Sequence, residues 1–500
     1  MCCLVGIECL SAWLAGCYFS AAVSNECANV ICSDEMNIIC STLLKVLRSW
    51  PGILAVALFG LQGCATYSSS FRAVDRDLAA QNYDAALSDN AKESKSPKDR
   101  VLYLLNKGMI LRMKRDFKDS NLAFGAAKTE MDRLYAASVT ENALSVMVND
   151  SMVSYSGDNY ERILLHLYMA LNYLELGQPD SARVEALQVD DDLREFAEKH
   201  PNSKFSEDAF TLYLTGMIYE DRGEWSDAMI SYRSAYNAYM KDFAYYRVAL
   251  PSTLKDDLMR MAKRVGLRNE LRKYEAEFNV DPLDNKRADP DRGELIFVLN
   301  NGLAPVKHER TAALVDPNSG IMVRISLPYY ESRNDYNNNV VAARITVSDK
   351  QSTTELVENV DAIARKNLED HMPAIIARSI ARAVVKTEAV RRAQAGAMNG
   401  NNNGNNNGAM FGMLGALALQ VAAVASEQAD TRSWLTLPSN IQLARLSLPP
   451  GSYSVKVELL GADQMVVATQ DFPNIAIRKT HKTFLTQHWI PQQITTGELK

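Results

Sequence analysis

Residues 209–242 read AFTLYLTGMIYEDRGEWSDAMISYRSAYNAYMKD, and the spacing of their apolar residues predicts two antiparallel helices. Gly223, in the middle of the stretch, marks the turn between them. Small side chains recur where two helices would have to approach closely, and large ones recur where they would fill the space between the helices. The small residues are Gly216, Ala228 and Ala235, and the large ones are Leu212, Tyr219 and Tyr232.

Two further stretches follow the same spacing, one starting at Val101 and a more degenerate one starting at Ile163. Half-matches flank them at residues 82–87 and 254–265. Helix pairs that recur at about 34 residues are typical of tetratricopeptide (TPR) repeats. We therefore predict a TPR-like α-helical repeat array over residues 71–280, with a non-repeating helical bundle as the alternative. Stacked repeats expose an extended surface that usually binds peptides or proteins.

Residues 281–292 are rich in Asp and Pro and predict a linker. After it, short apolar or alternating runs predict β-strands; these runs are 295–299, 321–327, 340–347, 443–448, 452–459, 465–468 and 482–487. Residues 356–386 follow a helical period instead. The predicted fold class is α+β: the helical array, followed over residues 293–500 by a mixed α/β domain with small antiparallel β-sheets.

Within the helical stretch 356–386, Ile376, Ile380 and Val384 lie on the predicted buried face. Arg378, Arg382 and Lys386 form a row on the other face. We expect this basic row to be solvated, with an acidic partner or lipid headgroups as the alternative.

Residues 399–408 form an Asn/Gly tract that predicts a flexible loop. The stretch 409–425 that follows contains no charged residue, and Gln420 is its one polar side chain. It is short for a membrane span, so we expect a helix packed against the protein. The alternative is an element that inserts in a membrane or drives oligomerisation.

Asp430, Arg432 and Trp434 share one face if their segment is extended. An Asp–Arg pair with the guanidinium beside an indole is a common way to fix a segment. We expect a structural role for these three residues, with partner binding as the alternative.

All eight cysteines lie within the first 64 residues, which argues against a disulfide framework or zinc site in the rest of the chain. Residues 36–63 are typical of an export signal. Basic Lys45 and Arg48 precede the apolar run 53–61, which is too short to span a bilayer comfortably. Met36 is a candidate translation start, and Met1 is the alternative.

The signal ends in Leu61, Gln62, Gly63 and Cys64, which resemble a lipobox, although Gln62 is unusual there. The resemblance implies that Cys64 is acylated, that residues 1–63 are a leader and that residues 64–70 are a lipidated tether. Leu14-Ala15-Gly16-Cys17 is a second match, but no basic residue precedes it. An uncleaved anchor and a soluble chain without an anchor are further alternatives. Ala65 after the cysteine favours an outer membrane lipoprotein facing the periplasm.

Over residues 64–490 the chain resembles an uncharacterised family of TPR-containing bacterial envelope lipoproteins. The resemblance rests on the lipobox, the helical repeats, Gly302-Leu303-Ala304-Pro305-Val306-Lys307 and the segment from Ala429 to Pro438. It implies a location and an architecture but no reaction.

The net charge of −6 and pI near 5.7 argue against a nucleic-acid partner. The sequence has no Gly-x-Ser-x-Gly, P-loop, Gly-x-Gly-x-x-Gly or His-Glu-x-x-His motif. We therefore expect no catalysis, cofactor or metal. The predicted function is a lipid-anchored adaptor that binds envelope proteins or peptides through its helical surface, with self-association possible. The alternatives are a subunit of a secretion or surface-assembly complex that uses 409–425, and a carboxylate-based cell-wall hydrolase.

Overall fold

The computed structural model describes residues 67–141, 150–199, 208–279, 291–315, 322–333, 340–399 and 427–491, together with residues 415, 417 and 418. These residues belong to one compact unit, Ala65–Lys500. The predicted leader 1–63, the lipobox Leu61–Cys64, nearly all of the linker and the Asn/Gly loop lie outside the described residues. The same holds for most of the apolar stretch 409–425.

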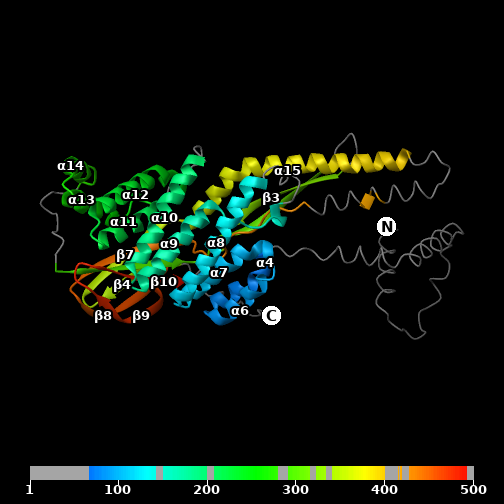
Figure 1. Cartoon of the computed structure of the whole chain (residues 1–500). Coiled ribbons are helices and arrows are strands. Elements are labelled where there is room, and N and C mark those ends of the chain that lie inside the picture. The colour runs from blue at the N-terminus through cyan, green and yellow to red at the C-terminus, as the bar shows by residue number, and fades with distance from the viewer. Residues whose placement is uncertain are drawn as a thin grey trace, which may run out of the picture. The chain divides into compact units, whose positions relative to one another are not determined.

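Helices account for nearly all of the described residues up to residue 279 (Figure 1). They are α4 (Tyr67–Ser70), α5 (Arg72–Ala79), α6 (Tyr83–Glu93), α7 (Arg100–Met113), α8 (Phe117–Glu141), α9 (Asn159–Glu175), α10 (Pro179–Lys199), α11 (Ala209–Asp221), α12 (Trp225–Tyr246), α13 (Ser252–Arg264) and α14 (Arg268–Glu277). The helices predicted from the three repeat-like stretches and the two half-matches are confirmed. The second stretch starts earlier than predicted, because Asp158 and Glu161 form a capping box at the start of α9.

One turn geometry joins the two helices of each pair, from α5–α6 to α13–α14. Each turn has three residues, and the middle one has a positive φ; these middle residues are Gln81, Arg115, Gly177, Gly223 and Gly266. In each turn the third residue donates its N–H to a carbonyl five residues earlier, as Glu224 does to Tyr219 at 2.9 Å. The helices therefore form a true repeat of one supersecondary unit, and equivalent positions can be compared between pairs.

Close approach within a pair depends on glycine. A Cβ atom on Gly108 of α7 would lie 2.4 Å from the Phe124 ring of α8, and one on Gly216 of α11 would lie 2.4 Å from the Tyr232 ring of α12. The aromatic ring of the second helix thus packs directly on the backbone of the first.

The remaining described residues form three sheets and one long helix, α15 (Val360–Asn399). The strands are β1 (Gly293–Asn301), β2 (Val306–Val315), β3 (Met322–Glu331), β4 (Ala342–Val347), β5 (Lys350–Thr353), β6 (Glu355–Glu358), β7 (Asn440–Leu448), β8 (Gly451–Leu460), β9 (Val466–Ile477) and β10 (Lys482–Trp489). The orders are β10-β1-β7-β6, β2-β3 and β5-β4-β8-β9. All pairs are antiparallel except β1 and β10, which run parallel.

The predicted strand runs are confirmed, but β2 and β5 were not predicted. β6 lies where the helix was predicted to begin, at residue 356; α15 begins only at Val360, so that start was wrong. β2 contains Lys307, His308, Glu309 and Arg310 in succession, and β5 and β6 are only four residues long. Apolar alternation is therefore weak or absent in these strands.

β1 explains how the helical array and the sheets are joined. Its Ile296 and Val298 belong to the core that also holds the helices of the array. Its Leu295, Phe297 and Leu299 belong to a second core between the two four-stranded sheets. Because both faces of β1 are buried, the strand appears in the sequence as a continuous apolar run. The array and the first sheet thus share one core.

Gly216→Ala should lower the free energy of unfolding by about 1–3 kcal/mol, because its Cβ overlaps the Tyr232 ring. Gly125→Ala is the matched control: it lies within α8, with nothing within 4 Å of the added carbon. That change should leave stability equal or raise it by about 0.5–1 kcal/mol. Urea unfolding of the full chain measures both, and equal stability of the two variants would contradict the packing described here.

Candidate functional site

The inner face of the array, defined here as the face that contacts residues 427–439, is occupied by the chain itself. Trp434 is 1% exposed and meets the rings of Phe124 and Tyr168 edge-on, at centroid distances of 5.7 and 6.1 Å. Its backbone N–H donates to Glu161 Oε1 at 2.7 Å, and its indole N–H donates to Thr436 Oγ1 at 3.0 Å. An extended partner would therefore have to displace a buried part of the protein from this surface.

Arg432 holds the same segment by its charge. Its Nε and Nη2 donate to Asp430 at 2.9 and 2.7 Å, and its Nη1 donates to Asp99 at 3.2 Å. The carbonyls of Val153 and Asp150 accept the other two bonds, both at 2.9 Å. All five N–H donors of the guanidinium are thus used, and the carboxylates hold the pKa of Arg432 above its ordinary value against the effect of burial. This geometry favours the structural role over partner binding.

The predicted Asp430–Arg432 pair is present, but the predicted contact of Arg432 with the indole is wrong. The guanidinium lies over the ring of Tyr155, 5.3 Å from its centroid. Trp434 instead enters the space between α8 and α9. The guanidinium instead donates to the carbonyls of residues 150 and 153, which lie just before α9.

The second motif of the family resemblance lies beside this segment. Ala304 N–H donates to the Leu437 carbonyl at 2.7 Å, and Lys307 Nζ donates to Asp158 at 3.1 Å. Burial, and then the negative charge of Asp158, raise the pKa of the nearby Glu161 carboxyl to about 7. The residues 302–307 and 429–438 therefore meet at the start of α9, which the sequence did not predict.

Two members of the basic row of α15 face inward: the side chains of Arg382 and Lys386 are 3% and 27% exposed, so their predicted solvation is wrong. Arg378, at 41%, is partly solvated. Arg382 and Lys386 contact Glu427 at 3.2 and 2.7 Å, and Glu427 is 1% exposed. Arg378 and Arg382 also lie 3.6 and 3.5 Å from Asp150. The periodicity separates the two faces of the helix correctly but does not say which one is buried. Here the buried carboxylate of Glu427 selects the basic face.

A further buried ion cluster, also missed from the sequence, joins the array to the first sheet. Arg445 of β7 contacts Asp257 of α13 and binds Glu294 of β1 at 2.7 Å. Lys482 of β10 binds the same Glu294, also at 2.7 Å. These two cations hold the pKa of Glu294 well below its ordinary value, although burial acts in the opposite direction.

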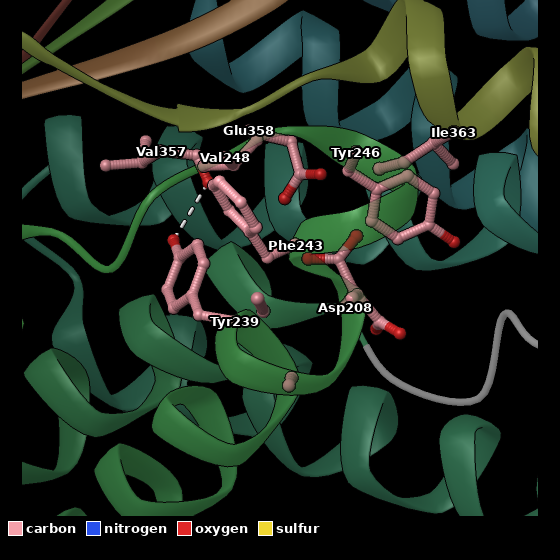
Figure 2. A pocket seen from close by; sticks show the side chains of 11 residues that line it. Asp208, Tyr239, Phe243, Tyr246, Val248, Val357, Glu358 and Ile363 are labelled. Atoms are coloured by element: carbon pink, nitrogen blue, oxygen red, sulfur yellow. Dashed lines mark hydrogen bonds between the residues drawn. The ribbon is translucent and has the colours of Figure 1, made fainter.

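A small cavity of about 20 Å³ lies between α12, the start of α11 and β6. Figure 2 shows Glu358, Asp208 and Tyr239 around it, with the Tyr239 hydroxyl donating to the Val357 carbonyl at 2.8 Å. The volume suits about one water molecule and no organic substrate. Within the described ranges, no group of three or more His, Cys, Asp or Glu side chains could hold a metal ion.

The carboxyls around this cavity are buried close together. Burial, followed by the negative charge of Asp208, raises the pKa of Glu358 well above its ordinary value of 4.5. Burial also raises the pKa of Asp208, against its bond from the Thr211 N–H. The fold therefore holds protons here that the unfolded chain would release.

The outer face of the array, formed by the second helix of each pair, carries an exposed apolar row. Leu122, Val184 and Ile230 are 67%, 55% and 56% exposed. Each is the sixth residue of its helix, α8, α10 or α12. The equivalent residues at the two ends of the array are polar and exposed: Ser88 of α6 and Lys273 of α14. The row thus spans the three central pairs only.

No protein-family model matches the chain, and no curated protein matches it. A tetratricopeptide repeat protein from Parabacteroides merdae is 13% identical, with 43% of this chain and 68% of that chain covered and a TM-score of 0.26. A structure of MamA protein is 13% identical over 43% of this chain and 96% of that one, also with a TM-score of 0.26.

MamA 41-end from Desulfovibrio magneticus RS-1 is 13% identical over 44% of this chain and 94% of that one, again with a TM-score of 0.26. The repeat in the array is shown by its own helices and turns. No helix among the described residues is both long and apolar enough to cross a membrane.

Glu358→Gln should remove part of the pH dependence of stability. Because native Glu358 keeps its proton where the unfolded chain loses it, the free energy of unfolding falls as pH rises above 4.5 and levels off above the native pKa. The variant should show a shallower fall over this window. Glu198→Gln, at an exposed position of α10, is the control and should follow the wild type. Urea unfolding at a series of pH values measures the difference, and identical slopes for Glu358→Gln and wild type would contradict it.

Proposed function

We propose that the protein is a non-catalytic, lipid-anchored adaptor whose TPR-type helical array binds an envelope protein through its outer face. The observation that carries this proposal is the exposed apolar row Leu122, Val184 and Ile230 at one repeated position. Isolated exposed apolar residues are ordinary on protein surfaces. Three at the same position of successive repeats form a line, which suits a partner with apolar side chains spaced along its length.

The inner face supports the same conclusion by elimination. Stacked repeats often bind ligands on that surface, but residues 427–439 occupy it along α7 to α9, where Trp434 is buried. Farther along the array, Arg445 of β7 contacts Tyr213 of α11 and Asp257 of α13. The outer helices leave a large surface for a partner. The absence of catalytic motifs in the sequence favours binding over catalysis.

We further propose that membrane lipid is the second partner, through acylated Cys64, and that the protein is an outer membrane lipoprotein facing the periplasm. The support is the sequence alone: the lipobox-like residues Leu61–Cys64, the basic and apolar stretches before them, and Ala65 after them.

The triple variant Leu122→Ser, Val184→Ser and Ile230→Ser should reduce capture of the envelope partner at least about tenfold, as expected for a few central apolar contacts. Cross-linking in intact cells, followed by mass spectrometry, identifies and counts the captured protein. Met240→Ser is the matched control, because Met240 is 56% exposed on α12 but lies outside the row. If the triple variant captures as much of the envelope partner as the Met240→Ser control does, the proposal is contradicted.

Cys64→Ser should release the protein from the membrane fraction, because a serine cannot take the thioether-linked lipid. Mass spectrometry of the extracted wild type should find a lipid-modified peptide that begins at Cys64. An unmodified chain that retains residues 1–63 would contradict both the anchor and the periplasmic location.

A further inference from the structure

The long helix α15, yellow in Figure 1, presents an exposed apolar face. Ile376, Ile380 and Val384 are 36%, 48% and 63% exposed. Most of the exposed residues between Glu369 and Arg391 are apolar. The exceptions are His371 and the side chains of Arg378 and Glu388, which are 41% and 37% exposed. An apolar face of this length on one helix is unusual for a surface in contact with water alone.

The fold holds this face outward. Arg382 and Lys386 on the opposite side are bonded to the buried Glu427. Rotating α15 to bury the apolar face would break these ion pairs and leave the Glu427 carboxylate buried without them, which is costly. The exposure of the face is therefore a fixed property of the structure.

The spacing of the face suits a second helix. Pro373, Ile376, Ile380 and Val384 follow one another at intervals of three, four and four residues. Such intervals keep apolar residues along one seam when two helices pack side by side. A helix from another molecule would cover this seam along its length.

The charges at the two ends of the apolar face indicate which helix packs against it. Glu369 lies eleven residues before Ile380, and Arg391 lies eleven residues after it. Eleven residues are close to three helical turns, so both charges lie on the same side of the helix as Ile380. Their side chains are 72% and 67% exposed.

The geometry points to a second copy of this chain as the occupant, with its α15 antiparallel and a two-fold axis near Ile380. In that arrangement Glu369 of each copy lies opposite Arg391 of the other, so the interface contains two equivalent pairs of opposite charges. A parallel pair would instead place like charges opposite each other.

The present partners of Glu369 and Arg391 leave both side chains free to turn toward the other copy. Arg391 pairs with Glu388 at the surface, where an ion pair contributes little. Lys366 is 9% exposed, but it also binds Asp370 at 3.0 Å and keeps that carboxylate when Glu369 turns away.

The interface formed in this way is small. Residues 369–391 span roughly 35 Å of helix, and one helix pair of that length buries less than the ~1,200–2,000 Å² of a standard stable interface. The dimer should therefore form and dissociate with concentration. The self-association proposed here uses α15 and does not depend on the outer row of the array.

Sedimentation velocity of the full chain in mild detergent, from about 1 µM to about 100 µM, tests the dimer over the range expected for a small interface. The wild type should shift from monomer to dimer. Ile380→Glu places two carboxylates against each other at the two-fold axis and should weaken the dimer at least about tenfold. Met465→Glu is the control: Met465 is 68% exposed in the turn between β8 and β9, away from α15 and from the outer row, and this change should leave the dimer unaffected.

The charge swap tests the antiparallel pairing. Glu369→Arg alone and Arg391→Glu alone should each weaken the dimer, and the double variant should restore it, because the opposite charges then meet again across the interface. All of these positions are on the surface, and circular dichroism checks that each variant is folded.

Several outcomes would overturn the proposal. A wild type that stays monomeric throughout is one, and a double variant as weak as the single variants is another. If Ile380→Glu has no effect while deletion of residues 409–425 abolishes assembly, the apolar stretch is the oligomerising element instead. If the wild type stays monomeric but binds vesicles of phosphatidylethanolamine and phosphatidylglycerol, and Ile380→Glu does not, the face binds lipid instead. The outer-row experiment can fail while this one succeeds, so the two proposals are tested separately.

Discussion

The docking of Trp434 between α8 and α9 is the contact on which the arrangement of the protein depends. The ring meets Phe124, and Phe124 is the residue that packs on the backbone of Gly108. The same ring meets Tyr168 of the following pair. One side chain from residue 434 thus joins two repeats that lie more than 260 residues earlier in the chain. Its backbone N–H is bound by Glu161, which also caps α9, so the segment is fixed at both side chain and main chain.

This contact changes what the array can do. Repeat proteins are stabilised mainly by contacts between neighbouring repeats, and their inner surface is normally free. Here the inner surface is part of the core that continues into β1, as Ile296 and Val298 show. The array is therefore stabilised by non-local contacts as well, and its free surface is the one formed by the second helices.

The sequence predicts the helices and most strands because the residue patterns that specify them lie within each element. Gly216, Ala228 and Tyr232 recur at helical spacing, and Gly177 and Gly223 mark two of the repeated turns. The same turn at Gln81 and Arg115 cannot be recognised in the sequence. Residues other than glycine occupy the left-handed position there, at a cost of about 1–2 kcal/mol. Tertiary contacts overcome that cost, and a local pattern cannot show them.

What the sequence could not predict is the pairing of buried charges. Arg432 was correctly paired with Asp430, two residues away, but Asp99 and the carbonyls of residues 150 and 153 come from distant parts of the chain. The clusters around Glu294 and Glu427 likewise join segments that are far apart.

α15 shows why this matters for function. Apolar periodicity alone places Ile376, Ile380 and Val384 inside and the basic row outside. Burying charged groups is costly unless they are paired, so the carboxylate of Glu427, held under the helix, requires Arg382 and Lys386 to turn toward it. The apolar face is then left outside. A polar contact inside the protein thus creates an apolar surface on its exterior.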